Sequence, residues 1–271
     1  MLADRLGTEV VSADALQVYR GLPILTNQPE RPTRLVGIRE PTEEMSLGEY
    51  ASLAHVAIDE LVEANDTAVV VGGTGLYLRA ALVDLAVPPA VSPQRRQHWA
   101  AVYDADPAAA HAQLAALDPR AANMVHANDR RRVVRALELA EQDDSLVPAD
   151  DRLWSEDMRV PTLVAGLEVP PRRIDERIRA RTADMFARGV VDEVRDVLAA
   201  GVSRTAGQAL GLQELAELPP EEAHERIVVR TRQYAAYQRK WMRRIPGIVM
   251  IDADRSPEEV ADAILEVARA G

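Results

Sequence analysis

The 271-residue chain contains no cysteine. This absence excludes disulfide bonds, thiolate nucleophiles and zinc sites built from cysteine. No run of about 18 apolar residues is present, so we expect no membrane-spanning helix. Residues 1–7 lack the basic and apolar regions of a secretory signal peptide. Together these absences favour a soluble, cytoplasmic protein.

Lysine is almost absent, since Lys240 is the one lysine in the sequence and arginine supplies the other basic side chains. The net charge of −11 argues against a nucleic-acid partner. The charge is unevenly spread, however, because residues 226–244 hold seven basic residues and no acidic one. This basic stretch is a candidate nucleic-acid surface, although charge alone favours a solvated helix face.

The apolar pattern near the N-terminus predicts a βαβ unit. Residues 9–12 and 67–71 are predicted strands, and the second is a β-branched run closed by two glycines. Between them, residues 46–64 have helical spacing, with Ser46 and Glu49 as a capping box. Strand, helix, strand implies a parallel sheet. Residues 160–169 and 248–251 are two further predicted strands.

The middle of the chain predicts only helices, including residues 108–117 and 129–141. Residues 201–244 are again mostly helical. With 47% hydrophobic residues the chain can bury a large core. We therefore expect an α/β core from residues 1–87 and 159–271, and a helical insertion domain from residues 88–158.

Ligands of open parallel sheets bind beyond the carboxyl ends of the strands. Residues 12–19 and 72–77 follow the first two predicted strands. Asp14 is placed to accept a proton, and Thr74 offers a hydroxyl at a predicted helix start. The alternatives are a helix N-cap at Asp14 and an ordinary βα turn at the glycines, and geometry leaves both open.

Four segments carry a resemblance to a known family. They are VSADALQVYRG at 11–21, VGGTGLY at 71–77, HANDRRRVVRALE at 126–138 and TRQYAAYQRKWMR at 231–243. In this order and spacing they resemble the hallmark motifs of tRNA dimethylallyltransferases, and residues 177–193 fit the segment between the last two. The resemblance covers essentially the whole chain. It implies a P-loop NTPase-like parallel sheet core with a helical insertion domain that contacts tRNA.

The resemblance implies that a dimethylallyl group passes from dimethylallyl diphosphate to N6 of the adenine at position 37. This adenine lies next to the anticodon in tRNAs that read codons beginning with U. Asp14 would be the general base and Thr74 a second catalytic residue, with base flipping to bring the adenine into the site. The residues implied to bind the tRNA anticodon stem-loop are Asp14, Ala15, Leu16, Gln17, Thr74, Arg96, Arg239 and Arg243.

The leaving diphosphate needs charge neutralisation, for which the resemblance implies Mg²⁺ and basic side chains. Arg132 and Arg135 are candidates, although solvated charges on a helix explain them equally well. The metal ligands are not identified by the sequence. We expect a bacterial, cytoplasmic, monomeric enzyme without a membrane partner.

One departure from the family is large. Its members begin with a strand and a phosphate loop of the form GxxxxGK[ST], and residues 1–271 contain no such loop. Residues 1–6 are expected to be the tail of the helix that follows the loop, and the chain as printed is expected to have little activity.

The sequence leaves three alternatives open. They are an isopentenyltransferase acting on free adenine nucleotides, a tRNA-binding relic without catalysis, and a P-loop kinase relative. The basic stretch and the helical insertion favour tRNA over a free nucleotide.

Overall fold

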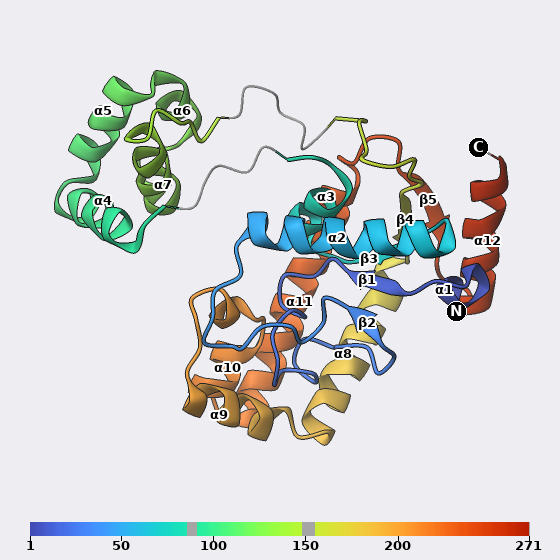
Figure 1. The fold of residues 1–271 in the computed structure, drawn as a ribbon. Coiled ribbons are helices and arrows are strands. Elements are labelled where there is room, and N and C mark those ends of the chain that lie inside the picture. Colours follow the sequence, from blue (N-terminus) through green and yellow to red (C-terminus); the bar gives the residue numbers. More distant parts are fainter. Residues whose placement is uncertain (86–90, 148–154, 271) are drawn as a thin grey trace. The chain divides into compact units, whose positions relative to one another are not determined.

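The computed structural model describes residues 1–85, 91–147 and 155–270. The chain divides into two compact units, shown in Figure 1. Unit 1 comprises Met1–Val83 and Glu156–Gly271, and unit 2 comprises Asp84–Ser155. Unit 1 is therefore assembled from two separate stretches of the chain.

Unit 1 contains two small parallel sheets. In the first, β1 (Val10–Ser12) lies between β2 (Thr33–Arg34) and β3 (Val69–Val71). In the second, β4 (Ala165–Glu168) pairs with β5 (Val249–Asp252). The predicted parallel α/β class is confirmed, with the difference that β3 and β4 share no hydrogen-bonded ladder. The predicted sheet is therefore divided in two within the described residues.

The valines that predicted strands at β1 and β3 pair with each other across the two strands. Val10 lies opposite Val69, and Val11 lies opposite Val70. β-Branched side chains pack well across such a ladder. Val11 is fully buried, whereas Val71 at the end of β3 is 56% exposed. The strands are shorter than predicted because hydrogen bonding to a neighbour, rather than the apolar pattern, determines where each begins.

Helix α2 (Leu47–Asn65) confirms the predicted crossover helix. The Ser46 hydroxyl accepts a hydrogen bond from the Glu49 amide at 3.1 Å, so the predicted N-cap is present. Tyr50, Ile58 and Leu61 are buried along one face. This stripe packs α2 against α3 (Gly75–Leu82) and against β1.

The other helices of unit 1 lie at its N-terminus and in its second chain segment. They are α1 (Leu2–Leu6), α8 (Pro171–Ala187), α9 (Val190–Ala200), the 3₁₀ helix η2 (Ala206–Gln208), α10 (Leu212–Glu217), α11 (Pro220–Met242) and α12 (Pro257–Ala270). Helix α11 packs against both α8 and α3. It thereby joins the C-terminal part of the chain to the helix that follows β3.

Unit 2 consists of four helices in the described residues. They are α4 (Pro93–Ala105), α5 (Pro107–Leu117), α6 (Pro119–Met124) and α7 (Arg130–Ala140). Each of the first three begins with a proline that follows a serine or aspartate cap, which is a favourable helix start. Trp99, Leu114 and Leu137 are buried in its core. The helices predicted over 108–117 and 129–141 are thus confirmed.

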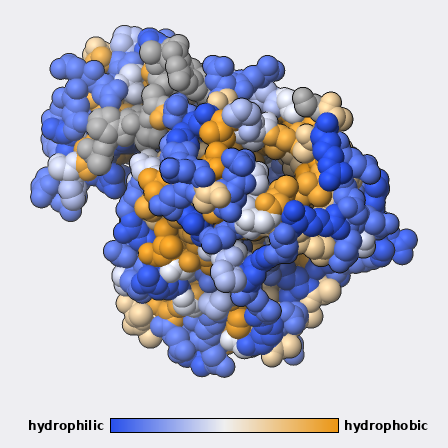
Figure 2. Space-filling model, turned by 45° about the vertical axis from the view of Figure 1, so that its right-hand side comes forward, coloured by the Kyte–Doolittle hydropathy of each residue, from blue (hydrophilic) through white to orange (hydrophobic). Residues whose placement is uncertain are grey.

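The surface exposes several large hydrophobic side chains. On the face drawn in Figure 2, hydrophobic patches lie between hydrophilic residues. In unit 1 the exposed hydrophobic side chains include Val71, Leu167 and Met250, one from each of β3, β4 and β5. Among the described helices we find none with both the length and the apolar character needed to cross a bilayer.

Candidate active site at the ends of β1 and β3

The segments that follow β1 and β3 lie directly against each other. The Ala13 amide donates to the Val71 carbonyl at 2.7 Å. A Cβ atom at Gly72 would overlap the carbonyl oxygen of Ala13, so this close approach requires glycine. Beyond this point the Ala15 amide donates to the Thr74 hydroxyl at 3.4 Å. The structure therefore brings the two predicted site segments together.

The Asp14 carboxylate is held by the turn that it begins. Its Oδ1 accepts hydrogen bonds from the amides of Leu16 at 2.8 Å and Gln17 at 3.4 Å. The capping role that the sequence left open is therefore present. Its Oδ2 has no hydrogen-bond partner among the described residues, so one carboxylate oxygen is fixed and the other remains able to accept a proton.

Three tyrosines, Tyr50, Tyr77 and Tyr234, interact electrostatically with this carboxylate. The ring centroids of Tyr50 and Tyr77 lie 4.4 Å apart, and the Tyr50 hydroxyl donates to the Ser12 carbonyl at 3.0 Å. Burial, followed by the negative charges of Tyr77 and Asp14, raises the pKa of Tyr50. Burial, with the charges of Tyr19 and Asp14, raises the pKa of Tyr77 to about 12. Burial also raises the pKa of Tyr234, so all three phenols are neutral at physiological pH.

Arg181 of α8 is a cationic member of the site that the sequence reasoning missed. Its Nη2 donates to the Leu25 carbonyl at 3.5 Å. Burial lowers the pKa of Arg181, and the negative charge of Asp14 opposes that shift. The segment that contains it was recognised as part of the family pattern, but nothing in the local sequence indicates that Arg181 lies near Asp14.

The Gln17 side chain is engaged within the chain. Its Oε1 accepts from the Ser12 hydroxyl at 2.8 Å, and its Nε2 donates to the Asn27 carbonyl at 2.9 Å. These bonds fix the loop that follows β1. The predicted tRNA contacts of Gln17 and of the neighbouring Ala15 and Leu16 stay predictions.

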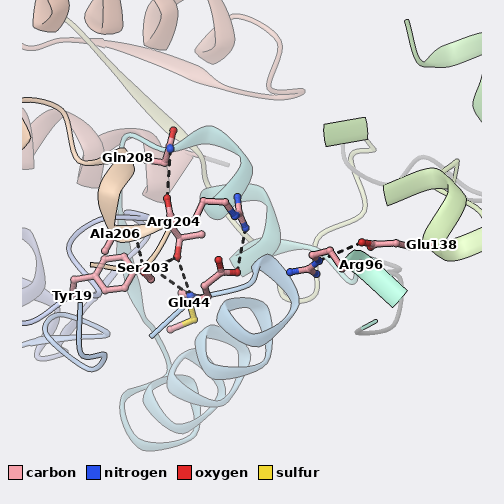
Figure 3. Close-up of polar contacts among 10 residues, drawn as sticks. Tyr19, Glu44, Arg96, Glu138, Ser203, Arg204, Ala206 and Gln208 are labelled. Atoms are coloured by element: carbon pink, nitrogen blue, oxygen red, sulfur yellow. Dashed lines mark hydrogen bonds and ion pairs between the residues drawn. The ribbon is translucent and has the colours of Figure 1, made fainter. Parts of the chain in front are cut away.

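Tyr19, at the end of the same motif, is a core residue. It is fully buried, and its hydroxyl lies 2.6 Å from the Thr205 hydroxyl. The same oxygen accepts a hydrogen bond from the Met45 amide at 3.2 Å (Figure 3). Tyr19 thus ties the site segment to the loop before α2 and to the loop before η2.

The basic stretch is only partly neutralised. Arg230 forms an ion pair with Glu214, and Arg232 forms one with Asp175. Arg239 and Arg243, which were predicted to bind tRNA, form no ion pair within the described residues. The structure is therefore compatible with a positive surface on the last turns of α11, and the tRNA contact stays a prediction.

Arg96, Arg132 and Arg135 belong to unit 2. Arg96 Nε lies 3.3 Å from one carboxylate oxygen of Glu138 (Figure 3). Arg135 Nη1 lies 3.1 Å from the other, and Glu138 is 1% exposed. Arg132 is exposed and lies 3.6 Å from Asp129. Arg96 and Arg135 are thus organised around one buried carboxylate, whereas Arg132 is a solvated charge at the start of α7.

A protein-held metal does not fit these residues. Within the described parts of the chain no group of three His, Cys, Asp or Glu side chains could hold a metal ion. At the site itself Asp14 supplies a carboxylate, and one of its two oxygens is already used by backbone amides.

Small parallel sheets whose strand ends present a fixed carboxylate, a hydroxyl and neutral phenols are typical of an α/β enzyme whose substrate binds at the strand ends. The chain belongs to the IPP transferase family, whose model matches residues 17–245. Membership of this family makes it a prenyltransferase.

Individual relatives agree with this assignment. The chain is 37% identical to the tRNA dimethylallyltransferase of Corynebacterium jeikeium, over 97% of this chain and 88% of that protein. It is 39% identical to the tRNA dimethylallyltransferase of Anaeromyxobacter dehalogenans, over 96% of this chain and 91% of that protein. Among solved structures, the full-length tRNA isopentenylpyrophosphate transferase of Bacillus halodurans matches with a TM-score of 0.69 and 28% identity, covering 100% of this chain and 90% of that one.

Proposed function

We propose that this chain transfers a dimethylallyl group from dimethylallyl diphosphate to N6 of the adenine at position 37 of tRNA. The tRNAs are those that read codons beginning with U. The observation that carries the proposal is the hydrogen-bonded approach of the two segments that carry Asp14 and Thr74 at the ends of β1 and β3. The names of the relatives, which are tRNA dimethylallyltransferases, support the choice of substrate.

In the proposed reaction the adenine N6 attacks the allylic carbon that bears the diphosphate. The new carbon–nitrogen bond forms as the carbon–oxygen bond breaks, and the diphosphate leaves with the electron pair. The N6 proton passes to Asp14. Fixing Oδ1 with two amides leaves Oδ2 as the proton acceptor. The adenine must leave its stack in the anticodon loop to reach the carboxylate.

The neutral tyrosines support this assignment. Because burial raises the pKa of Tyr50 and of Tyr77, neither phenol competes with Asp14 as a base at physiological pH. We assign the phenols to substrate orientation and Asp14 to proton transfer.

We assign stabilisation of the leaving diphosphate first to Arg181, because its charge interacts with Asp14 at the site. Arg132 and Arg135 of unit 2 are further candidates. We propose that Mg²⁺ accompanies the diphosphate, held chiefly by the phosphate oxygens, as is common for this ion. The described residues provide no complete ligand set for it.

Binding of the anticodon stem-loop is assigned to the residues around Asp14 and to three arginines. Arg239 lies in the last turn of α11, Arg243 is the C-cap of that helix, and Arg96 lies on α4. Local positive charge can bind phosphates although the net charge is −11, because the interaction is screened within about 8–10 Å.

The test of the proposed function is Asp14→Asn, assayed with labelled dimethylallyl diphosphate and an anticodon stem-loop. Asparagine retains the turn, so the loss of a general base should lower kcat by about 10²–10⁴ while stem-loop affinity changes little. Asp106→Asn is the matched control, since Asp106 accepts hydrogen bonds from the amides two and three residues ahead, as Asp14 does. Wild-type turnover by Asp14→Asn would refute the assignment, and preferential prenylation of AMP would move the substrate from tRNA to free nucleotides.

A further inference from the structure

One face of α11 is fitted to the turn that carries Thr74. Tyr234, Gln238 and Trp241 are four and three residues apart, so they lie on one side of the helix. Gln238 Nε2 donates to the Gly73 carbonyl at 2.9 Å. The contact joins residues that are 165 positions apart in the sequence.

The glycines of the turn allow this fit. A Cβ atom at Gly73 would overlap the Gln238 amide, and a Cβ atom at Gly75 would overlap the Trp241 ring. Tyr234 completes the contact. Burial raises its pKa, and hydrogen bonds with Thr74 and Gln238 oppose part of that rise.

The contacts continue from Thr74 to the general base. The Thr74 hydroxyl also accepts the Ala15 amide at 3.4 Å, and Ala15 follows Asp14 directly. The turn is therefore bonded on one side to Gln238 of α11 and on the other to the segment that holds the catalytic carboxylate, and Tyr234 interacts with both Gln238 and Thr74 between them.

The opposite side of the same helix, with its C-cap, carries the arginines that were predicted to bind tRNA. At about 100° per residue, Arg239 and Arg243 lie roughly 140–180° around the helix from Tyr234. A single rigid helix thus connects a basic face with the turn at the active site.

We infer that Tyr234 and Gln238 are positioning residues, which hold the Gly73–Gly75 turn and through Thr74 set the geometry around Asp14. The inference rests on the proposed function for the reaction that this geometry serves. It assigns two effects to one helix: the face bearing Tyr234 and Gln238 governs kcat, and the face bearing Arg239 and Arg243 governs tRNA affinity.

The experiment compares Gln238→Leu and Tyr234→Phe with two matched controls on the same helix. Tyr237→Phe and Gln233→Leu make the same chemical changes at positions whose side chains form no hydrogen bond with the turn among the described residues. Tyr237 is 61% exposed, compared with 39% for Tyr234. We expect the two test variants to lower kcat about five- to thirtyfold, as the loss of one or two hydrogen bonds should. The KM for the stem-loop should stay within about twofold.

The variant Thr74→Val tests whether Tyr234 acts through the Thr74 hydroxyl. If Tyr234 acts through the Thr74 hydroxyl, Tyr234→Phe should have no further effect on kcat in the Thr74→Val background. Additive effects in the double variant, a change in KM instead of kcat, or test variants that match their controls would each overturn the inference.

Hydrogen exchange gives a readout that does not depend on turnover. Gln238→Leu should accelerate amide exchange in peptides covering residues 72–78, whereas Gln233→Leu should not. A wild-type protein that fails to prenylate tRNA would refute the proposed function, while the exchange result would still decide whether Gln238 holds the turn. Unchanged exchange in Gln238→Leu would refute the positioning role.

Discussion

Replacing Gly75 with alanine places a methyl group where the Trp241 indole packs in the wild-type protein. The new Cβ atom would be closer to the ring atoms Cδ2, Cε2 and Cζ2 than van der Waals contact allows. Overpacking of this kind costs about 1–3 kcal/mol. Alanine also favours the helix that begins at Gly75, by up to about 1 kcal/mol. The net expected loss is about 1–2 kcal/mol, which lowers Tm by about 2–8 °C for a chain of this size.

Thermal and urea unfolding followed by circular dichroism would measure this loss. Gly207→Ala is the control, because no atom lies within 4 Å of its Cβ position and its φ is not in the left-handed region. Its stability should be unchanged or slightly increased. In a Trp241→Ala background the obstacle is gone, so Gly75→Ala should become neutral or stabilising. If the loss persists in that background, the reasoning from the indole contact is refuted.

Three further outcomes are expected. Changing Arg239 and Arg243 to glutamine should weaken stem-loop binding and reduce the slope of log K against log salt by about one per lost phosphate contact. Fluorescence anisotropy would measure this slope, and an unchanged slope would place both side chains away from the RNA. Burial raises the pKa of Glu193 above its ordinary 4.5, so the folded state favours the protonated form. The stability of the wild type relative to Glu193→Gln should therefore be highest below about pH 4.5 and fall as the pH rises above it. Urea unfolding across about pH 4–7 would measure this difference. Glu138→Gln should destabilise the protein by about 1–3 kcal/mol, because this carboxylate is buried between two arginines. Glu141→Gln, which removes a more exposed partner of the same helix pair, should cost less than about 1 kcal/mol, and equal losses in urea unfolding would count against the buried pair.

Local patterns in the sequence were sufficient to predict the elements around Asp14. The valines of β1 and β3 and the capped, amphipathic α2 encode their conformations within a few residues. Strand β2 was missed, since Thr33 and Arg34 are polar and are defined as a strand by their pairing with Val10 and Val11. The two-residue strand has no periodicity from which to predict it.

In the candidate site, too, some residues could be predicted from local sequence patterns and others could not. Asp14 and Thr74 could be predicted because each directly follows a recognisable strand. The approach of Arg181, and the fit of Gln238 and Trp241 to the glycine turn, depend on how α8 and α11 pack. Such contacts between distant positions leave no periodic signal in the sequence.

The two backbone segments of unit 1 that flank unit 2 are hydrogen-bonded to each other. The Arg159 amide donates to the Leu82 carbonyl at 2.9 Å, so the two ends of the interruption are already hydrogen-bonded to each other. Residues 84–155 are thus an insertion whose two flanking segments meet at one hydrogen-bonded position. A few glycine and serine residues could span such a distance, which makes this junction suitable for excising unit 2 or exchanging it between relatives. For the folding chain it also means that unit 2, whose contacts are local, can form early and shorten the loop that unit 1 must close.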